Sequence, residues 1–261
     1  SSIIDLCLEM FDWAHFRRAK GAIKLHLLLD HDGYLPAFAI ITEGKVADVK
    51  MAWQFQFDPH TIVVDDRGYN DYALFQHWTS QSVYFVTRMK DNAVYEVIRK
   101  NKVPQNRHIL KDEIIELRGS GAFEKCPNQL RRIEFYNSEK QEILVFLSNH
   151  LKLGASTVAA IYKDRWQIEL FFKALKQNLK IKTFVGTSAN AVKIQIWTAL
   201  LAMLILRFLQ LRSHFNWSLS NLVALLRMNL FTHRDMWAWL DQPFDVLPIP
   251  YDSEQLQFNL A

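Results

Sequence analysis

One stretch of the sequence, residues 157–179, gathers side chains that bind metal ions and phosphates. A helical rotation of about 100° per residue places five of them on one arc: Tyr162, Arg165, Glu169, Lys173 and Lys176. The opposite face is apolar, through Ile168, Phe171, Leu175 and Leu179. A carboxylate between cations suits both a metal ion and a phosphodiester backbone. The pattern also fits a solvated helix face with i,i+4 ion pairs, such as Glu169 with Lys173.

The spacing of four of these residues narrows the choice. Two residues separate Tyr162 from Arg165, three separate Arg165 from Glu169, and six separate Glu169 from Lys176. This pattern resembles the Y-R-E-K signature of bacterial insertion-sequence transposases of the insertion-sequence-four family, which carry a DDE triad on a ribonuclease-H-like fold. The resemblance implies that Glu169 is catalytic and binds metal. It also implies that Tyr162, Arg165 and Lys176 contact DNA phosphates near the cleaved end.

A second carboxylate follows the short apolar stretch 60–64. The run Asp66-Arg67-Gly68-Tyr69 resembles the family's second-aspartate motif, which implies that Asp66 is catalytic and binds metal. Asp65 is its neighbour, and strand alternation turns it to the other face. Two adjacent aspartates at a strand end also form an ordinary exit into a loop. The match to Arg-Gly-Tyr favours Asp66 over Asp65.

The third carboxylate of the triad has no match within the chain. In the family the first strand ends in an aspartate, and Ser1 to Leu8 resembles the segment after it. In this register the catalytic aspartate precedes Ser1, so we expect a piece truncated at its N-terminus that is inactive as it stands. Asp5 lies five positions too late, and we expect it to be a surface or capping residue.

Further cations could bind DNA around this site. Lys24 and His26 share one face of a predicted strand. Arg88 ends another strand beside the expected site, and Arg67 and Lys173 flank the two carboxylates. A charged strand exit explains these cations equally well, and His26 could be a buried core histidine.

The predicted elements follow the ribonuclease-H-like order. Strands in 1–8, 23–30 and 36–42 form a meander, with Asp32-Gly33 as a hairpin turn. A helix (48–57), a strand (60–64), a helix (70–81) and a strand (82–88) come next. The fold class is therefore α/β, with a mixed sheet flanked by helices.

Residues 91–156 contain short segments of alternating polarity separated by turn residues. This pattern predicts a β-rich insertion before the Glu169 helix, with strands at 109–117, 130–136 and 143–147. We therefore expect a discontinuous ribonuclease-H-like catalytic domain, 1–90 and 157–261, and an insertion subdomain, 91–156. The C-terminal part is predicted to hold helices at 189–211 and 218–228, and then an irregular tail, 243–261.

Composition adds weaker limits. Half of the residues are hydrophobic, which allows a sizeable core, and the net charge of +4 only hints at a polyanionic partner. Two cysteines give neither a disulfide framework nor metal-ligand spacing. The most apolar run, 194–206, is too short to span a bilayer and predicts a buried helix.

We therefore expect the catalytic domain of a DNA transposase that cleaves and joins phosphodiesters with two Mg²⁺ or Mn²⁺ ions. Its partners would be double-stranded DNA, at transposon ends and target, and a second copy in a homodimeric DNA complex. It would act in the bacterial cytoplasm, at the nucleoid, without a membrane. The alternatives are a non-catalytic DNA-binding remnant that acts as an inhibitor, or another two-metal nuclease on the same fold.

Overall fold

The structure is a computed structural model, which describes residues 1–7, 9–17, 20–103, 105, 108–119, 121–179 and 183–245. Its contacts divide the chain into two compact units, Ser1–Trp197 and Thr198–Ala261. Each unit is described by itself below.

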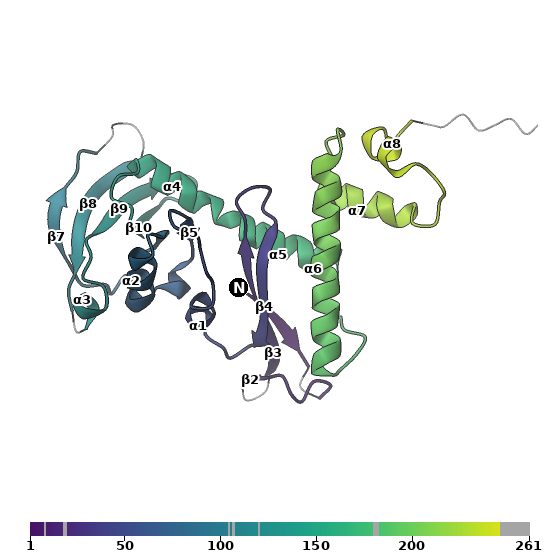
Figure 1. The fold of residues 1–261 in the computed structure, drawn as a ribbon, viewed down its shortest axis with the longest axis horizontal. Coiled ribbons are helices and arrows are strands. Elements are labelled where there is room, and N and C mark those ends of the chain that lie inside the picture. Colours follow the sequence, from purple (N-terminus) through teal and green to yellow (C-terminus); the bar gives the residue numbers. More distant parts are fainter. Residues whose placement is uncertain are drawn as a thin grey trace, which may run out of the picture. The chain divides into compact units, whose positions relative to one another are not determined.

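The N-terminal strands form a four-stranded antiparallel sheet, sheet A (Figure 1). Its longest strand, β3 (Lys20–Leu29), pairs with all the others: β1 (Ser2–Leu6), β2 (His15–Arg17) and β4 (Pro36–Glu43). The predicted turn joins β3 to β4, with Gly33 at a φ of 74°, where a residue without a Cβ fits without strain. The predicted meander is confirmed.

A second, mixed sheet of six strands, sheet B, holds the rest of the β structure. Its order is β5-β6-β10-β9-β8-β7. The parallel pair consists of β5 (Ile62–Val64) and β6 (Tyr84–Arg88), and the other pairs are antiparallel. The remaining strands are β7 (Tyr95–Lys100), β8 (Ile109–Leu117), β9 (Leu130–Asn137) and β10 (Glu142–Ser148).

The strands predicted for the β-rich segment are confirmed, and β7 was not predicted. Because β10 pairs with β6, this segment extends the sheet begun by β5 and β6 rather than forming a sheet of its own. The boundaries of the catalytic domain and of the insertion subdomain stay a prediction.

Helices cover both faces of sheet B (Figure 1). On one face, α2 (Tyr72–Ser80) packs Phe75 and Trp78 against Phe85 of β6. The short helix α3 (Ala122–Lys125) joins the same core. On the other face, α4 (Ala155–Asp164) packs against Val86 and Phe146. This arrangement confirms the α/β, ribonuclease-H-like fold class.

Two predicted helices differ from the structure. The helix expected over 48–57 is only α1 (Asp48–Ala52). The aromatic residues that follow it leave the helical path and pack elsewhere: Trp53 lies 5.0 Å from His77 and Phe57 lies 5.9 Å from Trp78, between ring centroids. Tertiary packing of these rings outweighs the helical periodicity.

The helix expected over 157–179 is divided into α4 and α5 (Trp166–Asn178). Between them, the Arg165 amide donates to the Tyr162 carbonyl three residues earlier, at 3.1 Å, in place of a regular helical bond. The predicted exposed arc is also wrong at its first member, because the Tyr162 ring is buried and lies 4.8 Å from the Phe146 ring.

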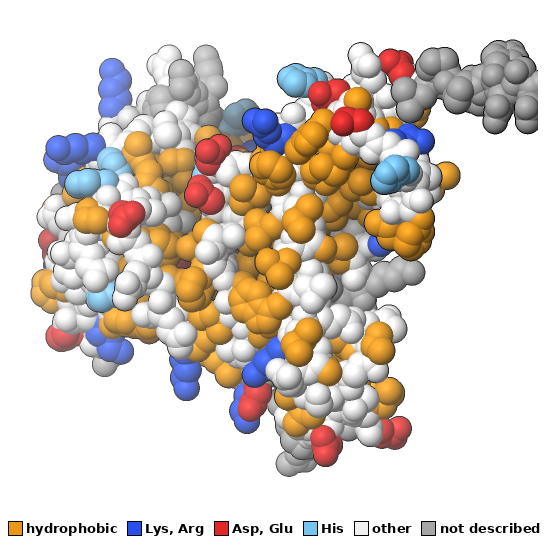
Figure 2. All heavy atoms as spheres, turned by 45° about the vertical axis from the view of Figure 1, so that its right-hand side comes forward, with side chains coloured by type: hydrophobic (Ala, Val, Ile, Leu, Met, Phe, Trp, Pro, Cys, Tyr) orange, Lys and Arg blue, Asp and Glu red, His pale blue; other side chains and the backbone are white. Residues whose placement is uncertain are grey.

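A long helix, α6 (Ala189–Arg212), runs from the first unit into the second. By length and composition it is the one helix in the described part of the chain that could cross a membrane, and a third of its most apolar window is buried. The prediction of a buried helix is wrong for one face, since Leu201 and Ile205 are about 60% exposed. Figure 2 draws the hydrophobic side chains of one face of the molecule in orange.

The second unit also holds α7 (Leu219–Met228) and α8 (Met236–Asp241). The helix predicted over 218–228 is confirmed, and Ser218 caps it, since its side chain accepts the Asn221 amide at 3.2 Å. Trp217, Leu222 and Leu240 form the core of this unit. The sequence did not predict α8, and most of the expected irregular tail, residues 246–261, lies outside the described residues.

Candidate active site

The first candidate carboxylate, Asp66, leaves the end of β5 and opens a 3₁₀ turn, η1 (Arg67–Tyr69). Its Oδ1 accepts the Gly68 amide at 2.7 Å. A Cβ at Gly68 would lie 2.8 Å from the same oxygen, closer than side chains come. The glycine of the Arg-Gly-Tyr motif therefore lets the backbone approach and fix the Asp66 carboxylate.

Asp65 faces the opposite way, as strand alternation predicts. Only 8% of it is exposed, and the Thr87 hydroxyl is a polar neighbour of its carboxylate that opposes the effect of burial on its pKa. Burial raises the pKa of Asp65 to about 8, and the negative charge of Asp66 adds to the rise. The two adjacent aspartates thus occupy very different environments.

The second candidate carboxylate, Glu169, lies in the first turn of α5. Its Oε1 accepts a hydrogen bond from Arg165 Nη2 at 2.8 Å. The Arg165 guanidinium also lies over the Tyr162 ring, 5.5 Å from its centroid. The Arg165 and Glu169 side chains are 20% and 42% exposed, so the ion pair is partly accessible to solvent.

Electrostatics link Asp66 to this pair. Burial lowers the pKa of Arg165, but the hydrogen bond to Glu169 and the charges of its neighbours, Asp66 included, outweigh burial and raise the pKa. Burial likewise raises the pKa of Tyr162, against the opposing charges of Arg165 and Arg88. Asp66, Glu169 and Tyr162 are therefore all within electrostatic range of Arg165, and Arg88 is within range of Tyr162.

The start of β1 contacts both the turn that follows Asp66 and the helix that carries Glu169. The Ser1 amino nitrogen donates to the Tyr69 hydroxyl at 3.3 Å, and Lys176 of α5 donates to the Ile3 carbonyl at 3.1 Å. Asp5 points away and is exposed, as expected of a surface residue.

The other predicted DNA contacts divide into two groups. Lys173 is exposed, and Arg67 is exposed but paired with Asp91 at 2.6 Å. Lys24 is largely enclosed, since its ammonium donates to the Val46 carbonyl at 2.7 Å and lies 3.1 Å from Asp48. Lys24 thus takes part in a shielded ion pair, and its contact with DNA stays a prediction.

His26 is a fully buried histidine of sheet A, the structural one of its two predicted roles. Its Nε2 lies 2.9 Å from the Thr42 hydroxyl. Burial lowers the pKa of His26 to about 4, so the ring is neutral at physiological pH.

The donor chemistry of Asp66 and Glu169 fits Mg²⁺ or Mn²⁺, because both ions prefer oxygen ligands. Each carboxylate uses one oxygen in the bonds described above, so the other oxygen can serve as a ligand. The described residues contain no group of three histidine, cysteine, aspartate or glutamate side chains that could hold a metal ion.

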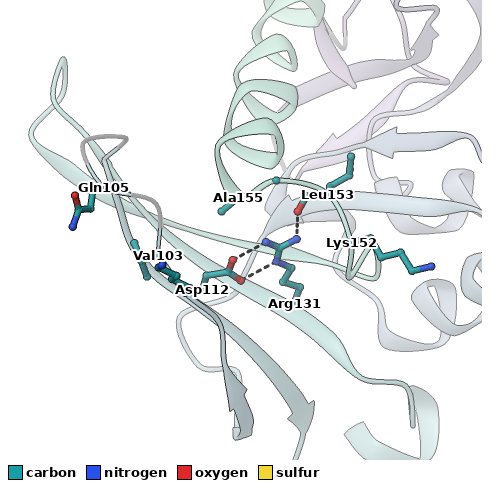
Figure 3. Close-up of a pocket in the computed structure, with 9 residues that line it drawn as sticks. Val103, Gln105, Asp112, Arg131, Lys152, Leu153 and Ala155 are labelled. Atoms are coloured by element: carbon teal, nitrogen blue, oxygen red, sulfur yellow. Dashed lines mark hydrogen bonds and ion pairs between the residues drawn. The ribbon is translucent and has the colours of Figure 1, made fainter.

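A separate pocket of about 760 Å³ lies between β8, β9 and the start of α4 (Figure 3). Arg131 crosses its floor, with two hydrogen bonds to Asp112 at 2.6 and 2.8 Å and a third to the Leu153 carbonyl. None of the described residues that line it belongs to the group around Arg165. The pocket is thus not part of the candidate site.

Asp48 was not singled out from the sequence, yet it lies next to this site. It accepts the Ser1 hydroxyl at 2.9 Å and pairs with Lys24. No spacing pattern marks it, since its partners are 47 and 24 positions away along the chain.

Comparison with known proteins gives the family. The chain is 30% identical over 244 residues to a protein of Sinorhizobium fredii named as a transposase, with 92% of this chain and 68% of the relative aligned. It is 28% identical over 224 residues to a Geobacillus stearothermophilus protein named as the transposase of insertion sequence element IS5377, with 84% and 58% aligned. A Synechocystis protein named as a transposase for element IS4SA is 30% identical over 158 residues, with 57% and 41% aligned.

The chain thus spans between 41% and 68% of the lengths of these relatives. The family model of the transposase DDE domain matches residues 12–205, which include both candidate carboxylates and the whole of sheet B. This chain belongs to the family of transposase DDE domains.

Proposed function

We propose that the chain is the catalytic domain of an insertion-sequence transposase, with Asp66 and Glu169 as two of its metal-binding carboxylates. It would hydrolyse a phosphodiester at each transposon end, and the freed 3′-hydroxyl would then attack the target DNA. The observation that supports this most is the grouping of Asp66 and Glu169, about a hundred positions apart, around Arg165.

Two divalent cations, Mg²⁺ or Mn²⁺, would supply the Lewis acid that activates the attacking oxygen and stabilises the leaving one. Gly68 and Arg165 hold the two carboxylates in place before the substrate arrives. We further propose that Arg165 exchanges Glu169 for a phosphate, because a guanidinium binds both groups in the same two-bonded geometry. This exchange would turn Glu169 toward the metal.

The proposed DNA contacts are the cations around this group. Phosphates would be bound by Lys176, Lys173, Arg88 and Arg67. The buried ring of Tyr162 would pack against the Arg165 guanidinium and hold it in place. The partner is double-stranded DNA, held by two copies of the chain in the bacterial cytoplasm. The third carboxylate is proposed to precede Ser1, since Ser1 lies beside Tyr69 of the Asp66 turn.

The test uses the transposase that includes the strand position before Ser1, and measures cleavage of element-end DNA with Mg²⁺. Asp66→Asn and Glu169→Gln should each lower cleavage by at least a hundredfold while leaving DNA binding in place. Glu139→Gln is the matched control, because Glu139 is an exposed glutamate paired with Lys163. If both site variants cleave like the parent protein, the assignment is wrong.

The same experiment distinguishes the enzyme from the alternative, a non-catalytic DNA-binding protein. A parent protein that binds end DNA, yet does not cleave it with Mg²⁺ or Mn²⁺, would be the non-catalytic DNA-binding form. Salt dependence of binding reports the phosphate contacts, since each lost contact flattens the dependence of log K on log salt by about one.

A further inference from the structure

Asp48 is the first residue of α1, but it does not cap that helix. The preceding residue, Ala47, occupies the cap position, and no side chain caps the first turn. The Asp48 carboxylate turns instead toward sheet A, where one oxygen, Oδ1, meets Lys24 Nζ at 3.1 Å and the Ser1 hydroxyl at 2.9 Å. These contacts come in addition to the favourable position of an acidic residue in the first turn of α1.

Lys24 supplies the counter-charge for Asp48. Their side chains are 12% and 25% exposed, so the pair is largely shielded from water. His26 Nδ1 also faces Asp48 Oδ1, at 3.6 Å, but His26 is neutral.

The contacts of Asp48 continue into the candidate active site. Ser1, which Asp48 binds through its hydroxyl, donates from its backbone nitrogen to the Tyr69 hydroxyl. Tyr69 ends η1, the turn that Asp66 opens. The next link comes from α5, where Lys176 binds the Ile3 carbonyl of β1. The start of β1 is thus held between the Asp66 turn and the helix that carries Glu169.

Side-chain contacts hold β1 near the Asp66 turn, because backbone pairing does not join these two segments. Among the described strands, sheet A and sheet B share no ladder of hydrogen bonds. Strand β1 is fixed to β3 on one side, but its distance from the end of β5 depends on side chains. Asp48, paired with Lys24, is the anionic member of that connection.

We propose that Asp48, held by Lys24, is a positioning residue that fixes the start of β1 against the Asp66 turn. This inference rests on the proposed function, since it concerns the same pair of carboxylates. Asp48 itself need not touch metal or DNA. Its loss would let β1 and η1 move apart, which would loosen the ligand set without removing a ligand.

The first readout is hydrogen exchange, which does not depend on catalysis. Asp48→Asn should speed amide exchange in β1 and in η1 about tenfold or more, while exchange in β8 and β9 stays as in the parent protein. Asp112→Asn is the matched control, because it removes a charge from another enclosed ion pair, with Arg131. It should speed exchange in β8 and β9 and leave β1 and η1 unchanged.

The second readout is the affinity for Mn²⁺, measured by electron paramagnetic resonance of the free ion. Asp48→Asn should weaken Mn²⁺ binding about threefold to tenfold, and Asp112→Asn should not weaken it. Ser1→Ala removes only the hydroxyl that meets Asp48 at an exposed position, and should weaken binding about twofold. This variant keeps the test decisive if Asp48→Asn fails to fold.

Failure of the inference and failure of the proposed function give different results. If Asp66→Asn and Glu169→Gln leave Mn²⁺ binding unchanged, the proposed site is wrong. If those two variants lose binding while Asp48→Asn and Ser1→Ala keep the parent affinity and the parent exchange of η1, Asp48 has no positioning role.

Discussion

The environment of Asp65 predicts a specific dependence of stability on pH. The ordinary pKa of an aspartate is 3.8, and burial raises that of Asp65 to about 8. The folded protein therefore binds a proton at Asp65 that the unfolded chain has already released above pH 4. Stability contributed by this protonation is present at low pH and is lost as pH rises toward 8.

The magnitude follows from the pKa difference. Each pH unit in this window costs about 1.4 kcal/mol, so the free energy of unfolding should fall by about 4 kcal/mol between pH 5 and pH 8 through Asp65. Above pH 8 the contribution levels off. Asp65→Asn removes the titration and keeps the shape of the side chain, so the variant should lack this slope.

The assay is urea unfolding of the parent protein and of Asp65→Asn at several pH values from 5 to 9, with a chelator present. The difference in unfolding free energy between the two should change by about 4 kcal/mol over the window, in favour of the variant as pH rises. The absolute difference at one pH is not diagnostic, because the substitution also changes the hydrogen bonding of this buried side chain. A difference that stays constant from pH 5 to pH 8 would refute the raised pKa of Asp65.

Two further predictions concern the stability of the two units. Phe75→Ala should lower the free energy of unfolding by about 3–5 kcal/mol in urea, because the fully buried Phe75 ring stacks 4.1 Å from Phe85. Phe123→Ala, at a position that is 39% exposed, should cost far less and serves as its control. Ser218→Ala should lower unfolding stability by about 1 kcal/mol through loss of the α7 cap, whereas Ser218→Asp should retain it. Thermal unfolding of the second unit measures this change, and an unchanged midpoint in Ser218→Ala would contradict it.

Local sequence patterns predicted most of the elements. Alternation of apolar residues located β8, and Asp32-Gly33 located the turn between β3 and β4. The α2 cap was also predictable, since the Asp71 side chain accepts the Leu74 amide at 2.9 Å. These features depend on neighbours within a few positions, which a sequence displays directly.

The features that were wrong depend on distant partners. The aromatic residues after Ala52 leave the helical path because rings of α2 and β4 lie within reach, and Tyr162 is buried because Phe146 lies beneath it. The pairing of Lys24 with Asp48 was likewise not predictable, because a strand pattern shows which residues share a face but not what covers that face. Here Asp48 covers it.

The candidate site shows the same division. Motif resemblance selected Asp66 and Glu169, and the structure adds how Gly68 and Arg165 hold them. The roles of these residues stay a prediction until the variants are measured. Strand alternation turned Asp65 to the other face, but the depth of its burial could not be predicted, because it depends on residues distant in the sequence, such as Thr87.

The pairing of β10 with β6 limits how such enzymes can be recombined. A chimera that exchanged residues 91–156 for a compact linker would leave β6 with a bare edge, open to strands of other molecules. It would also strip Leu117, Leu130 and Leu147 from the core that Phe75 and Trp78 share. Grafts between transposases are therefore expected to stay soluble when the donor segment brings its own equivalent of β10, and to aggregate when it does not.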